Sequence, residues 1–187
     1  MAMTRAGVWL SVEEMERLLA AVPNPRYRLM LKVAYLHGLR CSEVVGLTTK
    51  NVRDGYLTVQ RLKGSFKTVQ PLQYSDTDLF NEGKELNALV LNTRPGEHLF
   101  PITRFGVNKL IKRAGRRAGI PDHKLFPHVL KHSIAQQTIK GVGIENVRQW
   151  LGHKSIASTG NYLRVTDEEA GRAINAALHV SGEERKQ

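Results

Sequence analysis

The stretch from Leu151 to Tyr162 places a histidine, His153, nine positions before a tyrosine. A tyrosine hydroxyl can act as a covalent nucleophile when neighbouring groups activate it, although a lone tyrosine is more often a packing residue. A histidine beside it can exchange a proton or donate a hydrogen bond near neutral pH. Whether Tyr162 does chemistry therefore depends on the other groups that the fold brings to it.

A second cluster lies in the segment PHVLKHS, which begins at Pro127. On a helix His128 shares one face with Lys131, three positions on, and with His132, four positions on. The first turn of such a helix favours an anion. Two histidines four apart could also bind a metal, but no third ligand lies in obvious sequence reach, so we expect none. His132 could equally be a structural helix residue.

Two further segments carry cations. Arg40 follows the helix stop at Gly38 and could point into a cleft, or it could be a surface arginine paired with Glu43. Lys63 lies in a basic stretch, residues 61–67, where a lysine on a β-turn could reach a phosphate or donate a proton. The alternative for this stretch is a solvated basic turn.

Together these groups are suited to phosphodiester chemistry. Arginine, lysine and histidine donors can stabilise the charge that spreads over the non-bridging oxygens when an oxygen nucleophile attacks phosphorus. Such a reaction strictly requires neither a metal nor another cofactor.

Composition agrees with a polyanionic partner. The chain has 187 residues, enough for one domain, with a formal net charge of +11 and a pI near 10.0, and such a surface favours nucleic acid. A single cysteine, Cys41, excludes an internal disulfide and favours a reducing compartment. We see no signal peptide and no apolar run of the ~20 residues that a spanning helix needs. We therefore expect a soluble, cytoplasmic chain with no membrane contact.

Periodicity predicts a mostly α fold with a small antiparallel β-sheet, in one domain over residues 1–180 followed by a polar tail, 181–187. A capping box at Ser11 and Glu14 predicts the first helix, and Ser42 could cap a short third helix. The expected helices cover residues 11–22, 26–37, 42–47, 79–91, 104–118, 127–140, 144–151, 158–164 and 166–179. Alternating segments predict strands at 56–60 and 69–72, joined by a basic hairpin loop.

Four segments, in this order, resemble the catalytic domain of tyrosine recombinases, the phage integrase family. HGLRCSEVVGL is similar to the motif around the family's first arginine, and KGSFKTVQPL resembles its β-hairpin lysine segment. PHVLKHS resembles the second motif, and LGHKSIASTGNY resembles the third, including the nine-residue step to Tyr162. The resemblance covers roughly residues 10–165 and implies the family's fold and its cleavage and rejoining of DNA.

The resemblance implies a role for each matching residue. Tyr162 would form a 3′-phosphotyrosyl intermediate, without metal or ATP, and Arg40 would clamp the phosphate. Lys63 would protonate the 5′-hydroxyl leaving group. His128 would assist proton transfer around Tyr162, and His153 would donate to a non-bridging oxygen.

Other residues would support these. Glu43 matches an acidic position that supports the site without doing chemistry, His132 is a second supporting residue, and Lys67 is the alternative to Lys63. We expect further DNA contacts from four basic residues: Lys67, Arg61, Lys154 and Arg113. The implied partners are double-stranded DNA, a homotetramer on paired sites formed through the helix after Tyr162, and accessory proteins that bend DNA in a bacterial, archaeal or phage-infected cell, near its nucleoid.

Two departures from the family pattern leave alternatives open. Lys131 stands where the family has a second arginine; lysine keeps the charge but loses the planar fork that grips two oxygens. The chain could therefore be a recombinase, or a catalytically impaired DNA-binding regulator of recombinase descent. The pattern also begins almost at Met1, as in an excised domain or in small members such as the fimbrial phase-variation invertases. A relaxing enzyme of the type IB topoisomerase kind is a third reading.

Overall fold

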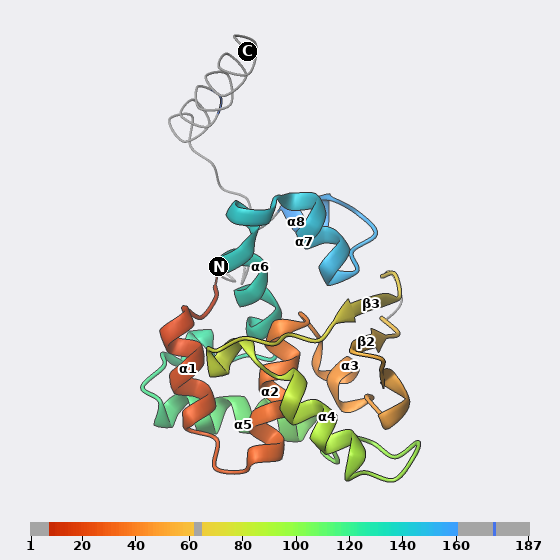
Figure 1. The fold of residues 1–187 in the computed structure, drawn as a ribbon. Helices are drawn as coiled ribbons and strands as arrows, with labels where there is room; N and C mark the ends of the chain where they lie inside the picture. Colours follow the sequence, from red (N-terminus) through yellow and green to blue (C-terminus); the bar gives the residue numbers. More distant parts are fainter. Residues whose placement is uncertain (1–7, 62–64, 161–173, 175–187) are drawn as a thin grey trace.

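The computed structural model describes residues 8–61, 65–160 and 174. Two predicted site residues, Lys63 and Tyr162, lie outside the described residues. Within them the chain is mostly helical with one three-stranded antiparallel sheet, which confirms the predicted fold class. Figure 1 shows α6, α7 and α8 gathered at one end of a body that contains the other helices and the sheet.

The body is built around α2. Helix α1 (Val12–Ala20) starts at the predicted capping box, in which the Ser11 hydroxyl accepts from the Glu14 amide and the Ser11 amide donates to the Glu14 carboxylate. Helix α2 (Pro25–Leu36) has eight consecutive buried residues at its end, the property of a helix surrounded by protein. Both α1 and α6 pack against it, and α1 also contacts α5 (Arg104–Arg117).

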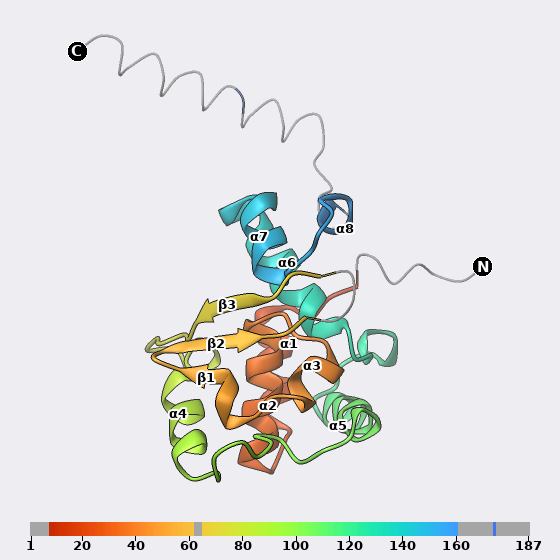
Figure 2. The same cartoon turned by 90° about the vertical axis from the view of Figure 1, so that its right-hand side faces the viewer.

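The sheet lies beside this body. Strands β1 (Val52–Arg53), β2 (Tyr56–Val59) and β3 (Thr68–Pro71) are antiparallel in that order, with Leu57 opposite Gln70 and Val59 opposite Thr68. Figure 2 shows β3 as the strand nearest α7, and these two elements are in contact. Helix α4 (Gly83–Leu91) follows the sheet, and short 3₁₀ turns cover Thr49–Asn51, Asp78–Phe80 and Asp122–Lys124.

The end that carries the second and third motifs consists of α6 (Val129–Val142), α7 (Ile144–Leu151) and α8 (Ala157–Gly160). A small core of Ala135, Ile139, Val147 and Leu151 joins α6 to α7. Gly38, which ends α2 at a φ of +58°, has no Cβ to collide with the Leu151 side chain. This close approach sets α7 directly against the end of α2, two residues before Arg40.

Some boundaries differ from the sequence predictions. Helix α3 (Cys41–Val45) is capped at Arg40, not at Ser42, because the Glu43 carboxylate reaches back to the Arg40 amide. Strand β1 was not predicted, since two residues give too short an alternation to detect. Helix α6 continues through Gly141 and ends before Gly143, whose φ is +81°. The final predicted helix lies almost wholly outside the described residues, so it and the predicted domain limits stay predictions.

Candidate active site

Arg40 and Glu43 form the first half of the site. The Arg40 guanidinium donates to Glu43 Oε1 at 3.0 Å, and its backbone amide donates to Glu43 Oε2 at 2.8 Å. The carboxylate is fully buried, whereas the Arg40 side chain is 26% exposed. Arg40 is therefore paired with Glu43, as the second alternative predicted, and the pairing holds a partly exposed guanidinium in place.

The charge on Glu43 is maintained by its surroundings. Burial alone would raise the pKa of Glu43, but the hydrogen bond from the Arg40 amide and the charges of Arg61, Lys131 and Arg40 bring it below its usual value. Glu43 is thus an anion at neutral pH that pairs with Arg40 and Arg61.

Lys131 lies on α6 with only 4% of its surface exposed. Its ammonium group donates to the Leu151 carbonyl at 3.1 Å. Desolvation, followed by the charges of Arg40 and Arg61, lowers the pKa of Lys131 to about 7, while Glu43 acts in the opposite direction. The residue at the second-arginine position is therefore close to its titration point at neutral pH.

His128 and His132 lie at the start of α6. His128 is exposed and occupies the cap position, and its carbonyl accepts from the His132 amide. Their rings are 6.4 Å apart, and His132 also lies against the Phe126 ring. Desolvation, Arg40 and Lys131 lower the pKa of His128; desolvation, His128 and Lys131 lower that of His132 to about 4. In the described part of the chain no three His, Cys, Asp or Glu side chains are placed to hold a metal ion.

His153 follows the left-handed turn at Gly152 and is 8% exposed. Its Nδ1 lies 3.0 Å from the Thr159 hydroxyl, and Nε2 makes no hydrogen bond within the described residues. Desolvation and the charges of Lys131, Arg40 and Arg61 lower the pKa of His153 to about 4. At neutral pH the ring is neutral and can offer one N–H to a ligand.

The hairpin meets this turn through its backbone. Ser65 pairs with His153 in an antiparallel bridge, and the Phe66 amide donates to the Gly152 carbonyl at 2.9 Å. The Ser65 hydroxyl also accepts from the Arg40 guanidinium at 3.4 Å. The hairpin segment next to Lys63 is therefore joined to both Arg40 and the His153 turn.

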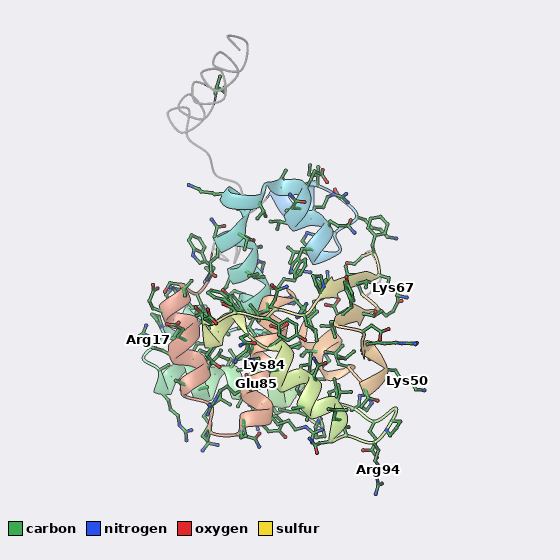
Figure 3. The ribbon with its side chains drawn as sticks, viewed as in Figure 1. Arg17, Lys50, Lys67, Lys84, Glu85 and Arg94 are labelled. Atoms are coloured by element: carbon green, nitrogen blue, oxygen red, sulfur yellow. The ribbon has the colours of Figure 1, made fainter. Side chains whose placement is uncertain are left out.

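One of the four residues predicted to contact DNA, Arg61, is buried in the structure. Arg61 is 3% exposed, and its guanidinium lies inside the protein against Glu43 at 3.2 Å. Its sequence neighbours are typical of an exposed basic loop, but its guanidinium is bonded to acceptors inside the protein. The other three, Lys67, Lys154 and Arg113, are exposed. Figure 3 shows Lys67 at the outer side of the molecule, beyond β3.

Sequence reasoning did not identify three residues that position the site: Ser65, Thr159 and Gln70. Gln70 donates to the Trp150 carbonyl at 2.8 Å and lies at 3.2 Å from the His37 ring. Its signal was present, because Thr68 and Gln70 occupy the inward positions of β3, and polar residues there indicate a buried hydrogen-bond network.

The described residues thus form a mostly helical domain with a small antiparallel sheet, and its cationic cluster surrounds the buried Glu43 carboxylate. The chain matches the phage integrase family over residues 8–169 and belongs to that family. It is similar to tyrosine recombinase XerA of Pyrococcus furiosus, with 32% identity over 182 residues covering 90% of this chain and 61% of that protein. With XerD of Pseudomonas putida it shares 35% identity over 188 residues, covering 92% of this chain and 62% of that protein.

Solved structures agree on the fold. The crystal structure of XerA recombinase superposes with a TM-score of 0.70 at 24% identity, over 91% of this chain and 65% of that one. The catalytic domain of bacteriophage HP1 integrase superposes with a TM-score of 0.65 at 25% identity, over 90% of this chain and 94% of that domain. The chain spans about three fifths of the length of the curated relatives it matches. Among the described helices none has the length and apolar character to cross a membrane.

Proposed function

We propose that this chain is a site-specific DNA recombinase that cuts and rejoins strands through a covalent bond to Tyr162. The observation that carries the proposal is the convergence of Arg40, Lys131, His128 and His153, from three separate motifs, on one centre. Desolvation is the largest cause of the lowered pKa of each of the last three, and the charge of Arg40, joined at the two histidines by that of Lys131, lowers it further. Such a concentration of donors around buried Glu43 matches the needs of a phosphoryl-transfer transition state.

The described residues have complementary tasks. Arg40 presents a partly exposed guanidinium, preorganised by Glu43, to the phosphate. His153, neutral and held by Thr159, offers Nε2–H to a non-bridging oxygen. Lys131, held by the Leu151 carbonyl, supplies positive charge when it is protonated. Because these groups are fixed before DNA arrives, they need little reorganisation during the reaction.

Two residues outside the described part of the chain, Tyr162 and Lys63, would take part in the bond changes. The Tyr162 hydroxyl oxygen attacks phosphorus and its proton passes toward His128, while the bond from phosphorus to the 5′ oxygen breaks. Lys63 gives a proton to that oxygen, with Lys67 as the alternative donor. The phosphotyrosyl ester conserves the bond energy, so a new 5′-hydroxyl can reverse the step without ATP or a metal.

The exposed cations support a double-stranded DNA partner. Helix α5 carries six basic residues that face solvent: Arg104, Lys109, Lys112, Arg113, Arg116 and Arg117. Arg104 lies near the site: its charge adds to the lowering of the His128 pKa, which desolvation dominates, and opposes the rise that burial gives the pKa of Cys41. These exposed cations can neutralise phosphates of a bound duplex.

Assembly on paired sites is part of the proposal. The λ integrase has been captured as a dimer on a core site and as a tetramer on a Holliday junction, and XerH on its difH substrate. We propose that this chain likewise assembles on DNA as a dimer and then as a tetramer. The segment after Tyr162 would join the protomers, and accessory proteins would bend the DNA. Whether the outcome is integration, excision or an invertase reaction would follow from the arrangement of the sites.

One observation favours a second candidate, a DNA-binding regulator with impaired catalysis. Lys131 places its amine on a backbone carbonyl and has no planar fork for a phosphate. The two candidates separate in one assay. Nicked duplexes with a randomised core would be incubated with the protein, and covalent protein–DNA adducts collected under denaturing conditions. A recombinase yields adducts that vanish in Tyr162→Phe; a regulator binds the same DNA and yields none.

A further inference from the structure

Arg61 is a buried cation at the junction of four segments. Its Nε donates to Thr68 at 3.0 Å. Nη1 donates to the Gly38 carbonyl and to Glu43, and Nη2 donates to the His37 and Trp150 carbonyls, at distances from 2.9 to 3.2 Å. All five N–H bonds of the guanidinium therefore have acceptors, which lysine with three could not match.

These acceptors include both supports of the site. Gly38 lies two residues before Arg40, and Glu43 holds the Arg40 guanidinium on its other oxygen. The Trp150 carbonyl belongs to the last turn of α7, three residues before His153. One guanidinium thus fixes the segments that present Arg40 and His153.

The end of α7 is capped by two buried cations. Its consecutive carbonyls at Trp150 and Leu151 accept from Arg61 and Lys131 respectively, at 3.0 and 3.1 Å. Cations at the C-terminus of a helix satisfy its last carbonyls and its dipole. The turn that follows, through Gly152 to His153, consequently starts from a fixed point.

We propose that Arg61 is a positioning residue that sets Arg40 and His153 at their mutual spacing, and that it does not contact DNA. The proposal rests on the proposed function for the meaning of that spacing, although the placement of Arg61 can be tested without any reaction. Arg61 is the first residue of a stretch whose sequence is typical of an exposed basic loop, and the proposal gives it a role inside the protein.

The first test is DNA binding by Arg61→Lys, Arg61→Met and the surface control Lys67→Met, measured with a short labelled duplex of arbitrary sequence over a range of salt. Removing a phosphate contact lowers the salt slope by about one. We expect that loss for Lys67→Met and an unchanged slope for both Arg61 variants. A lower slope in Arg61→Lys or Arg61→Met would overturn the proposal.

The second test measures adduct formation on the nicked duplexes. Small displacements of catalytic groups slow reactions by up to about 100-fold. We therefore expect Arg61→Lys, which keeps the charge and loses the fork, to form adduct at least about tenfold more slowly, at unchanged DNA affinity. An unchanged rate would overturn the proposal. An Arg61→Lys protein that no longer melts cooperatively would also overturn it, because Arg61 would then be required for folding alone.

The third test follows the His153 ring by NMR titration and needs no activity. The charge of Arg61 contributes to the low pKa of His153, together with desolvation and the charges of Lys131, Arg40 and His132. Arg61→Met should raise the pKa of His153, and Arg61→Lys should leave it nearly unchanged. If the unmutated protein forms no adduct, the proposed function fails, while the salt slope and this titration still decide the placement of Arg61. An unchanged pKa of His153 in a folded Arg61→Met protein would contradict the positioning role of Arg61.

Discussion

The ammonium group of Lys131 donates to the carbonyl oxygen of Leu151, two residues before His153. The contact joins the second and third motifs directly, since Lys131 lies on α6 and Leu151 ends α7. A lysine has three N–H donors, so two remain after this bond. Lysine at this position can therefore serve both the α7 end and a phosphate, each with less geometric control than an arginine.

Substitution of Lys131 separates charge from geometry. Lys131→Met removes the charge and the Leu151 contact, and we expect adduct formation to fall about 100-fold or more. Lys131→Arg keeps the charge and should retain or increase the rate. Adduct yield against time, at saturating DNA, is the measurement. A Lys131→Met protein with the unmutated rate would exclude a catalytic role for this residue.

The rate should also depend on pH through Lys131. Its pKa is about 7, lowered by desolvation and by Arg40 and Arg61, and opposed by Glu43. Above that value the amine is neutral and its help to the phosphate is lost, so the rate should fall as pH rises; a bound phosphate shifts the fall to higher pH. Rate profiles of the unmutated protein and Lys131→Arg provide the check, and Lys131→Arg should lack this fall.

The lowered pKa of Lys131 also affects the free energy of unfolding, which should rise with pH whereas the rate falls. The pKa of Lys131 in the folded protein, about 7, lies below the ordinary lysine value of 10.5, so between these values the unfolded chain binds more protons than the folded one. The contribution of Lys131 to the free energy of unfolding therefore increases with pH across that window. Urea unfolding at several pH values should show a smaller increase in Lys131→Met.

Removing the charge of Glu43 should destabilise the protein. In Glu43→Gln the cations Arg40 and Arg61 lose a buried anion, and we expect a loss of about 3 kcal/mol in the free energy of unfolding. Glu145→Gln is the control, because its pair with Arg148 is largely exposed on the Glu145 side, and its loss should be at most ~1 kcal/mol. Urea unfolding measures both, and equal losses would contradict the importance given to Glu43.

Gly152 tests the junction between the hairpin and the His153 turn. A Cβ there would lie 2.9 Å from the Phe66 carbonyl oxygen and 3.0 Å from Arg61 Cγ. Gly143, also at positive φ, has open space around it. Backbone strain should cost roughly 1–2 kcal/mol in Gly152→Ala, whose φ and ψ are left-handed helical. It should cost roughly 1–3 kcal/mol in Gly143→Ala, whose φ of 81° and ψ of 161° essentially only glycine adopts. Only Gly152→Ala should also slow adduct formation. Thermal melts and adduct assays measure the two effects; equal adduct rates would be the contrary result.

Much of the site could be predicted because its residues stand at sequence landmarks. Arg40 follows a helix-ending glycine, His128 and Lys131 share a helical face, and Gly152 ends a helix before His153. Local periodicity and capping signals are sufficient to place such residues on their helices and turns and to predict the fold class. Their roles were predicted only from the resemblance to the tyrosine recombinases.

Arg61 could not be placed in this way. In sequence it is one basic residue among several in a turn, and nothing local distinguishes it from exposed Lys67. Its burial results from long-range partners at His37, Glu43 and Trp150, which only the three-dimensional packing brings together. The pairing of Ser65 with His153 was hidden for the same reason.

The central claim is that Tyr162 becomes covalently bonded to DNA. The most direct measurement is peptide mapping of the adducts trapped on nicked duplexes with a randomised core. We expect a phosphotyrosine bond at Tyr162, carrying the 3′ end of the cleaved strand, and no adduct from Tyr162→Phe even though that variant still binds DNA. An adduct mapped to another tyrosine, or none at all from a folded, DNA-binding protein, would contradict it.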